Sequence, residues 1–128
     1  MKPTFARGAA SAFALLALAA AMSCGDGGTE PEANVVNARL VSPFSDDAAA
    51  LLELTGTIES VSAPADITVY THPGDGVTRV LLIRETPGIM EMTLRLPSGA
   101  APPAAKVLDV SDGQDQPRAD LGAYKVEY

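Results

Sequence analysis

Residues 90–96 alternate strictly between apolar and polar side chains, with Met or Leu at the even positions and Glu, Thr or Arg at the odd ones. A period of two is that of a β-strand with one buried and one solvated face. Turn residues bound the run, Pro-Gly at 87–88 and Pro-Ser-Gly at 97–99. The chain therefore has to bury one face of this strand against a second layer.

Seven other short apolar runs are separated by turn residues, at the spacing of all-β sandwiches. They comprise residues 35–41, 49–55, 58–61, 67–71, 77–84, 106–110 and 124–128. No helical pattern extends over ten residues. We therefore predict an all-β fold for residues 35–128, a small two-sheet antiparallel β-sandwich of about eight strands.

The sequence allows more specific predictions for one strand and one connection. Residues 77–84 are apolar on both faces in the middle of the run, which predicts a central strand covered on both sides. Residues 72–76 predict a hairpin with a loop rather than a tight two-residue turn. The expected core consists of Leu40, Leu52, Leu54, Ile58, Val69, Leu82, Met92, Leu94, Leu108, Tyr124 and Val126.

The N-terminus has the pattern of an export signal. Lys2 and Arg7 form a positive start, and residues 8–22 are uncharged and mostly Ala and Leu. A run of that length is shorter than the roughly 20 residues that a membrane-spanning helix needs, so we expect a signal peptide rather than a permanent span. The sole cysteine, Cys24, follows this run and has no partner for an internal disulfide.

Ala21-Met22-Ser23-Cys24 resembles the lipobox of bacterial lipoproteins. The resemblance implies that residues 1–23 are a lipoprotein signal peptide and that Cys24 carries the lipid. In that family an Asp directly after the Cys favours the inner membrane, so Gly25 implies an exported protein held in the cell envelope, at the outer membrane where the host has one. The alternative is an ordinary signal cleaved after Ala21, which leaves Cys24 as a free thiol.

Residues 24–34 are expected to be the lipidated Cys and a flexible linker, because residues 25–32 are rich in Gly and acidic side chains. From residue 24 onward the chain has 7 basic and 16 acidic side chains, a formal net charge of −9. The basic residues do not cluster, which argues against nucleic acid as a partner. The expected contact with the membrane is therefore the lipid anchor on Cys24.

Parts of the body are faintly similar to cohesin-type sandwiches. Residues 49–54 followed by 56–61 look like an early hairpin of that family, and residues 108–112 look like its ending. The resemblance implies a protein-binding or scaffold role.

Few residues point to catalysis or metal binding. His72 is the single histidine, it lies in a Pro-Gly loop, and no Gly-x-Ser-x-Gly elbow accompanies it. Asp109, Asp112 and Asp115 recur every third residue around a Gly, a pattern that holds Ca²⁺ in some loops but lacks EF-hand spacing. We expect an acidic turn rather than a metal site there.

The sequence therefore predicts a membrane-anchored envelope lipoprotein with a non-catalytic β-sandwich as a binding or structural module. We expect no cofactor, because phosphate-binding and haem motifs are absent from the sequence. The expected partner is an envelope protein or a polysaccharide. Two alternatives stay open: a hydrolase accessory domain with a cryptic site at His72, and Ca²⁺-dependent adhesion through Asp109, Asp112 and Asp115.

Overall fold

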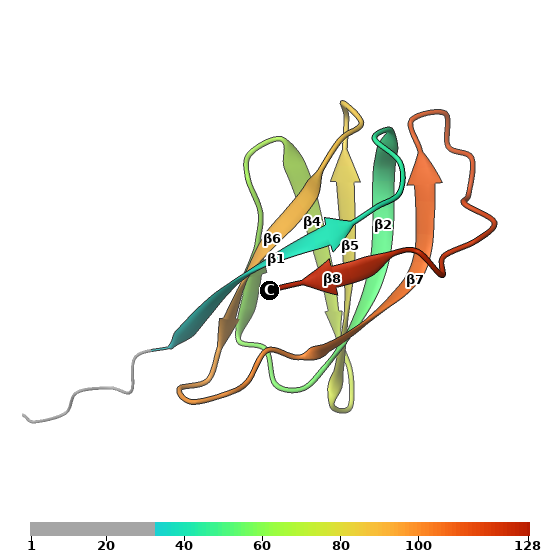
Figure 1. Cartoon of the computed structure of the whole chain (residues 1–128). Helices are drawn as coiled ribbons and strands as arrows, with labels where there is room; N and C mark the ends of the chain where they lie inside the picture. Colours follow the sequence, from blue (N-terminus) through green and yellow to red (C-terminus); the bar gives the residue numbers. More distant parts are fainter. Residues whose placement is uncertain (1–32) are drawn as a thin grey trace, which may run out of the picture.

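The computed structural model describes residues 33–128, which form eight β-strands and no helix (Figure 1). The strands are β1 (Asn34–Val41), β2 (Asp47–Thr55), β3 (Ser60–Ser62), β4 (Ile67–Pro73), β5 (Val77–Arg84), β6 (Met90–Leu96), β7 (Ala104–Asp112) and β8 (Lys125–Glu127). Within this range, no helix is long and apolar enough to cross a bilayer. The signal peptide and Cys24 lie outside the described residues.

The strands form two four-stranded antiparallel sheets, in the orders β3-β6-β1-β8 and β4-β5-β2-β7. The predicted all-β sandwich is confirmed. The pairs β1–β8, β2–β7, β3–β6 and β4–β5 are nested, as in a long hairpin folded back on itself. Only β4 and β5 are joined as a direct hairpin, because every other connection crosses between the sheets.

The core lies between the two sheets and consists of the side chains that point inward from each strand. The alternation in β6 is confirmed, because its even positions are buried and its odd positions are not. Ile58, Val69 and Val126 pack against the core while partly exposed. The buried core residues are Ala38, Leu40, Ala50, Leu52, Leu54, Ile67, Val80, Leu82, Met90, Met92, Leu94, Leu96, Val110 and Tyr124.

The prediction that Leu108 is in the core is wrong. In the pairing of β2 with β7, Leu51 faces Asp109 and Leu52 faces Val107, so Leu108 is the extra residue of a β-bulge. The bulge shifts the inward positions of β7, and Val107 packs against the core while Val110 is buried. Leu108 is left half-buried.

Two further expectations need correction. β5 is central in its sheet, but its outer face is not covered, because Leu81 is half-buried and Ile83 is 37% exposed. The β4–β5 hairpin is tighter than expected. The Gly74 amide donates to the Val77 carbonyl at 2.7 Å, which leaves only Asp75 and Gly76 at the turn. Gly76 has a φ of 71°, a conformation that glycine adopts without strain.

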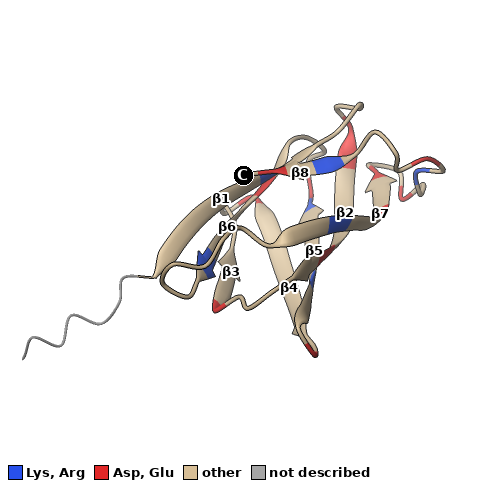
Figure 2. Ribbon diagram, turned by 60° about the horizontal axis from the view of Figure 1, so that its bottom comes forward, with Lys and Arg blue, Asp and Glu red and all other residues tan. Residues whose placement is uncertain are grey.

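We call the tip the end of the sandwich formed by loops 42–46, 85–89 and 113–124, and the base the opposite end, where β1 begins (Figure 1). Because β1 begins at the base, the chain enters the sandwich at the end remote from these three loops. The loop that follows β7 at the tip contains both acidic and basic residues, red and blue in Figure 2.

Candidate functional site

The tip carries two exposed apolar side chains on two different loops. Phe44 is 51% exposed and Ile89 is 62% exposed. A hollow of about 260 Å³ is lined by both side chains and by the buried Leu40 and Met90. Exposed apolar groups around a hollow are typical of binding surfaces.

Behind this hollow lies a buried carboxylate, that of Asp47, which is 1% exposed. Its Oδ1 accepts hydrogen bonds from Arg118 Nε and from the Tyr124 hydroxyl, each at 3.0 Å. Its Oδ2 accepts from the Ser42 hydroxyl. The charge is thus paired and fully hydrogen-bonded, which a buried carboxylate requires.

Arg118 links this network to Phe44. Its guanidinium carbon lies 4.2 Å from the centre of the Phe44 ring, the geometry of a cation–π contact. The same guanidinium bonds Asp46 at 2.5 Å and Asp47 at 2.9 Å. The Tyr124 ring packs against Phe44 with centroids 6.4 Å apart. Phe44 is therefore held in place from below while its outer side remains exposed.

The loop that carries Ile89 is held by a second arginine, Arg84, which lies at the end of β5. Arg84 Nε donates to the Thr86 carbonyl at 3.0 Å, and its Nη1 donates to the Ile89 carbonyl. Its Nη2 pairs with Asp66 at 2.6 Å. Two of these bonds hold the loop directly, and the pairing with Asp66 holds the guanidinium in position.

Backbone hydrogen bonds tie the three tip loops to one another. The Gly88 amide donates to the Asp47 carbonyl and the Gly113 amide to the Asp46 carbonyl, each at 3.0 Å. The Arg118 amide donates to the Val110 carbonyl at 2.7 Å. The loops therefore form one connected unit rather than three independent segments.

The network also changes the titration of its members. The pKa of the Arg118 guanidinium is raised, because its hydrogen bonds to Asp46 and Asp47 outweigh the desolvation that acts against its charge. Burial is the main cause that raises the pKa of the Tyr124 hydroxyl. At neutral pH the arginine stays charged and the tyrosine stays protonated, so both keep donating hydrogen bonds to Asp47.

The three aspartates considered for Ca²⁺ have separate environments. Asp109 is exposed, opposite Leu51 of β2. Asp112 Oδ1 accepts from the amides of Gln114 and Gln116, at 2.9 and 3.0 Å, and these bonds are the main cause that lowers its pKa. Asp115 is exposed in the turn, with a φ of 61°. In residues 33–128, no group of three His, Cys, Asp or Glu side chains is arranged to hold a metal ion.

His72 is exposed on β4, where it faces Arg79 of β5. The acid in the same cross-strand row is Glu53, and Arg79 Nε bonds its carboxylate at 3.5 Å. The converging buried acids that a cryptic hydrolase site at His72 requires are therefore not brought to it by this part of the fold.

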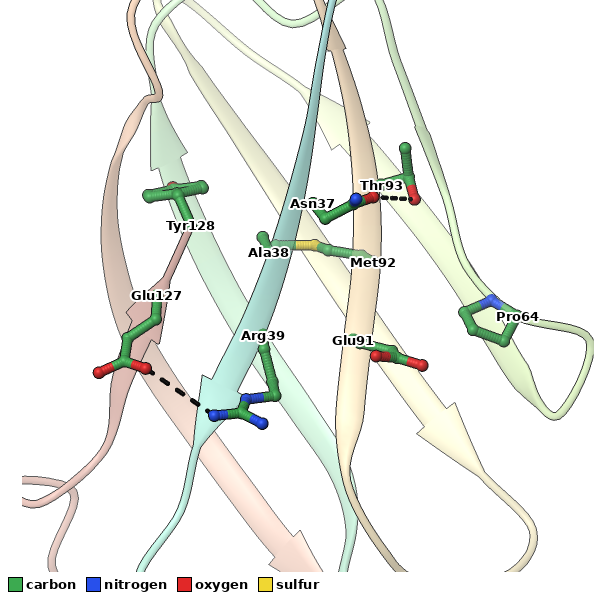
Figure 3. Close-up of a pocket in the computed structure, with 9 residues that line it drawn as sticks. All are labelled: Asn37, Ala38, Arg39, Pro64, Glu91, Met92, Thr93, Glu127 and Tyr128. Atoms are coloured by element: carbon green, nitrogen blue, oxygen red, sulfur yellow. Dashed lines mark hydrogen bonds and ion pairs between the residues drawn. The ribbon is translucent and has the colours of Figure 1, made fainter.

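A larger, shallow hollow of about 490 Å³ lies over the outer face of β1, β6 and β8 (Figure 3). Two pairs of its polar side chains contact each other. Thr93 donates to Asn37 at 3.0 Å, and Arg39 pairs with Glu127 at 3.9 Å. This hollow is lined by more charged and polar side chains than the hollow at the tip, which has Phe44 and Ile89 as exposed apolar groups.

Cys24, the expected lipidation site, lies outside the described residues. Among the described ones, sequence reasoning did not find the tip. Asp47 and Arg118 are 71 residues apart, and no periodic pattern indicates that they meet. The alternation of β2 places its inward side chains at positions 50, 52 and 54 and so predicts that Asp47 faces outward; its burial follows from the irregular pairing with β7 between Asp47 and Ala49.

Comparison of the chain with known proteins does not indicate a function. A scan against protein-family models, a search of curated proteins and a search of solved structures each gave no significant match to this chain.

Proposed function

We propose that this chain is a bacterial envelope lipoprotein, anchored by a lipid on Cys24, whose β-sandwich is a non-catalytic module that binds a partner protein with its tip. The observation that carries the proposal is the pair Phe44 and Ile89, two exposed apolar side chains on loops that arginines hold in place. Binding surfaces of this kind concentrate their energy in a few well-fixed apolar anchors. Fixing them before binding lowers the ordering cost of association.

The position of the chain's entry supports the same proposal. β1 begins at the base, so the linker proposed for residues 24–34 joins the sandwich at the end remote from Phe44 and Ile89 (Figure 1). A lipid attached through that linker leaves the tip accessible. The loops of a sandwich end are a common place for binding residues, because the sheets hold the loops in fixed positions.

A protein partner is favoured over a polysaccharide by the chemistry of the tip. Phe44 is engaged on one side by Arg118 and Tyr124. The remaining surface is a small apolar hollow beside Ile89, which suits an apolar side chain of a partner. A polysaccharide is the competing outcome of the test below.

The anchor is tested by the intact mass of the protein from the membrane fraction of a bacterial host, beside Cys24→Ala. We expect residues 24–128 with a diacylglycerol adduct, and loss of that adduct in the variant. An unmodified soluble chain beginning at Met22 would contradict the anchor and leave the tip proposal standing.

The tip is tested separately by replacing Phe44 with a photo-crosslinking amino acid in the native host. The matched control carries the same group in place of Thr93 of β6, on the polar outer face of the sheet β3-β6-β1-β8. We expect a protein adduct from position 44 that is lost in Ile89→Asp and absent from position 93. An adduct from position 93 alone, or a polysaccharide adduct from position 44, would contradict the proposal.

A further inference from the structure

The sandwich has four sheet edges, and three of them are short or protected. β3 and β8, the edges of one sheet, have three residues each. β7 contains the bulge and Lys106, and its end is covered by a bridge from Ser111 to Pro117 and by the Arg118 amide. Short edges, charges and bulges are devices that prevent a further strand from pairing.

The fourth edge, β4, lacks most of these devices. It pairs with β5 over all seven residues, Ile67–Pro73, without a register shift. None of the seven is an acid, a lysine or an arginine, and the one proline, Pro73, is the last residue. Ile, Thr, Val and Tyr favour strands. Within residues 33–128, no strand pairs with the free side of β4.

On the outer face of this sheet, one cross-strand row is apolar from β2 to the β4 edge, whereas the row that contains Glu53, Arg79 and His72 is polar and charged. Tyr70 of β4 faces Leu81 of β5, which faces Leu51 of β2. The next row contains Ile83 and Ala49. Tyr70 is 58% exposed and ends the first row at the free edge.

We propose that β4 is a self-association edge, where a second copy of this chain adds its own β4 antiparallel, with Tyr70 facing Tyr70 across a two-fold axis. This pairing joins the row of Leu51, Leu81 and Tyr70 to the same row of the second copy. It also builds one eight-stranded sheet from the two four-stranded ones. Directly opposed aromatic pairs stabilise antiparallel strands, and a two-fold interface is self-complementary by construction.

Charge favours a second copy at this edge over other faces. Residues 33–128 carry 13 acidic and 7 basic side chains, so two copies repel each other over most of their surface. β4 contains no acid, lysine or arginine, and the two rows that contain Leu81 and Ile83 carry no charge between β4 and β2; Asp109 of β7 lies at the far end of the first row. In the register centred on Tyr70, Thr68 faces His72 and Val69 faces Thr71, so no two like charges meet.

This inference does not rest on the proposed function. The strands of the two copies run in opposite directions, so the two tips lie at opposite ends of the dimer, and neither tip is part of the β4 interface. The loss of the dimer and the loss of partner binding are therefore separate outcomes.

The register is tested by Tyr70→Cys in the full chain carrying Cys24→Ala, so that the new thiol is the only one. Directly opposed positions on antiparallel strands have Cβ atoms about 4.5–5.5 Å apart, close to the roughly 3.5–4.5 Å of a disulfide, whereas diagonal positions are farther apart. We expect a disulfide-linked dimer on mild oxidation. Thr55→Cys, exposed on the same sheet away from β4, and Thr68→Cys are the controls, and we expect neither to cross-link. A mixture of Thr68→Cys and His72→Cys chains should cross-link.

The association itself is tested by native mass spectrometry of the detergent-extracted protein. We expect a dimer for the parent chain and a monomer for Tyr70→Lys, in which two lysines face each other; Thr55→Lys should remain a dimer. Thermal melts check that both variants fold. A monomeric parent, a dimer that persists in Tyr70→Lys, or equal cross-linking at positions 70 and 55 would overturn the inference.

Discussion

The hydroxyl of Tyr124 is the sharpest probe of the buried network at the tip. Tyr124→Phe removes one oxygen and leaves the ring, which is 7% exposed, in place against Phe44. The lost group donates to Asp47 Oδ1 at 3.0 Å. After the change, the buried carboxylate keeps Ser42 and Arg118 as partners.

A hydrogen bond to a charged group contributes about 1.5–3 kcal/mol to the free energy of unfolding. We expect the lower end, about 1.5 kcal/mol, because two partners of Asp47 remain. For a domain of this size, 1 kcal/mol lowers Tm by roughly 4–8 °C. Tyr124→Phe should therefore lower Tm by about 6–12 °C.

The chain provides its own controls, because its three tyrosines differ in what their hydroxyls bond. Tyr128 donates to the neutral Pro103 carbonyl at 2.6 Å and is half-exposed, so Tyr128→Phe should cost no more than about 1 kcal/mol. Tyr70 is exposed on the sheet face, and Tyr70→Phe should change Tm least. Chemical and thermal unfolding of the three variants, followed by circular dichroism, measures this order.

Equal Tm values for Tyr124→Phe and Tyr70→Phe would refute the reasoning, since they would mean that the Tyr124 hydroxyl contributes nothing to the stability of the Asp47 network. A larger effect of Tyr128→Phe than of Tyr124→Phe would refute it as well.

Three other changes test other parts of the fold. Val110→Thr buries a hydroxyl and should lower the free energy of unfolding by about 1–3 kcal/mol, whereas Leu108→Thr, at the bulge, should cost clearly less in the same denaturant titration. Folding lowers the pKa of the Asp112 carboxyl from its ordinary value of 3.8, so the ionised carboxylate stabilises the fold above pH 3.8. This contribution is lost as the pH falls through the lower pKa of the folded state. Asp112→Asn lacks it at every pH, so its Tm should fall less steeply below pH 3.8 than that of the parent. Gly113→Ala places a Cβ 2.5 Å from Pro87 Cγ, so it should lower Tm and weaken cross-linking from position 44, and an unchanged Tm would contradict that contact.

The strands could be predicted from the sequence because their signals are local. The alternation in β6 lies within seven residues, and turn residues mark both of its ends. The placement of Leu108 could not be predicted, since a bulge is defined by the partner strand, here by Leu51 and Leu52 of β2. The pairing of strands is also invisible to periodicity, which reports which face is buried but not what covers it.

The network at the tip could not be predicted from the sequence for a related reason. Phe44 looks like a loop aromatic, and Asp47 looks like the polar residue that precedes a strand. Their joint role depends on Arg118, which approaches from a loop far along the chain. A buried charge is recognisable only when its partner is known, so this part of the site required the three-dimensional arrangement.

The nested order of the strands constrains how the domain reaches its native state. Among the strands of residues 33–128, β4 and β5 are the only neighbours in sequence that pair directly, and their two-residue turn closes the shortest loop between paired strands. Pairing of β3 with β6, and of β2 with β7, must close longer loops, which cost more entropy. β1 emerges first during synthesis, yet its partners β6 and β8 emerge late. Folding should therefore start at the β4–β5 hairpin and proceed outward, with β1 unpaired until most of the chain is available. A mutation in that turn should then slow folding, while one in β8 should mainly speed unfolding.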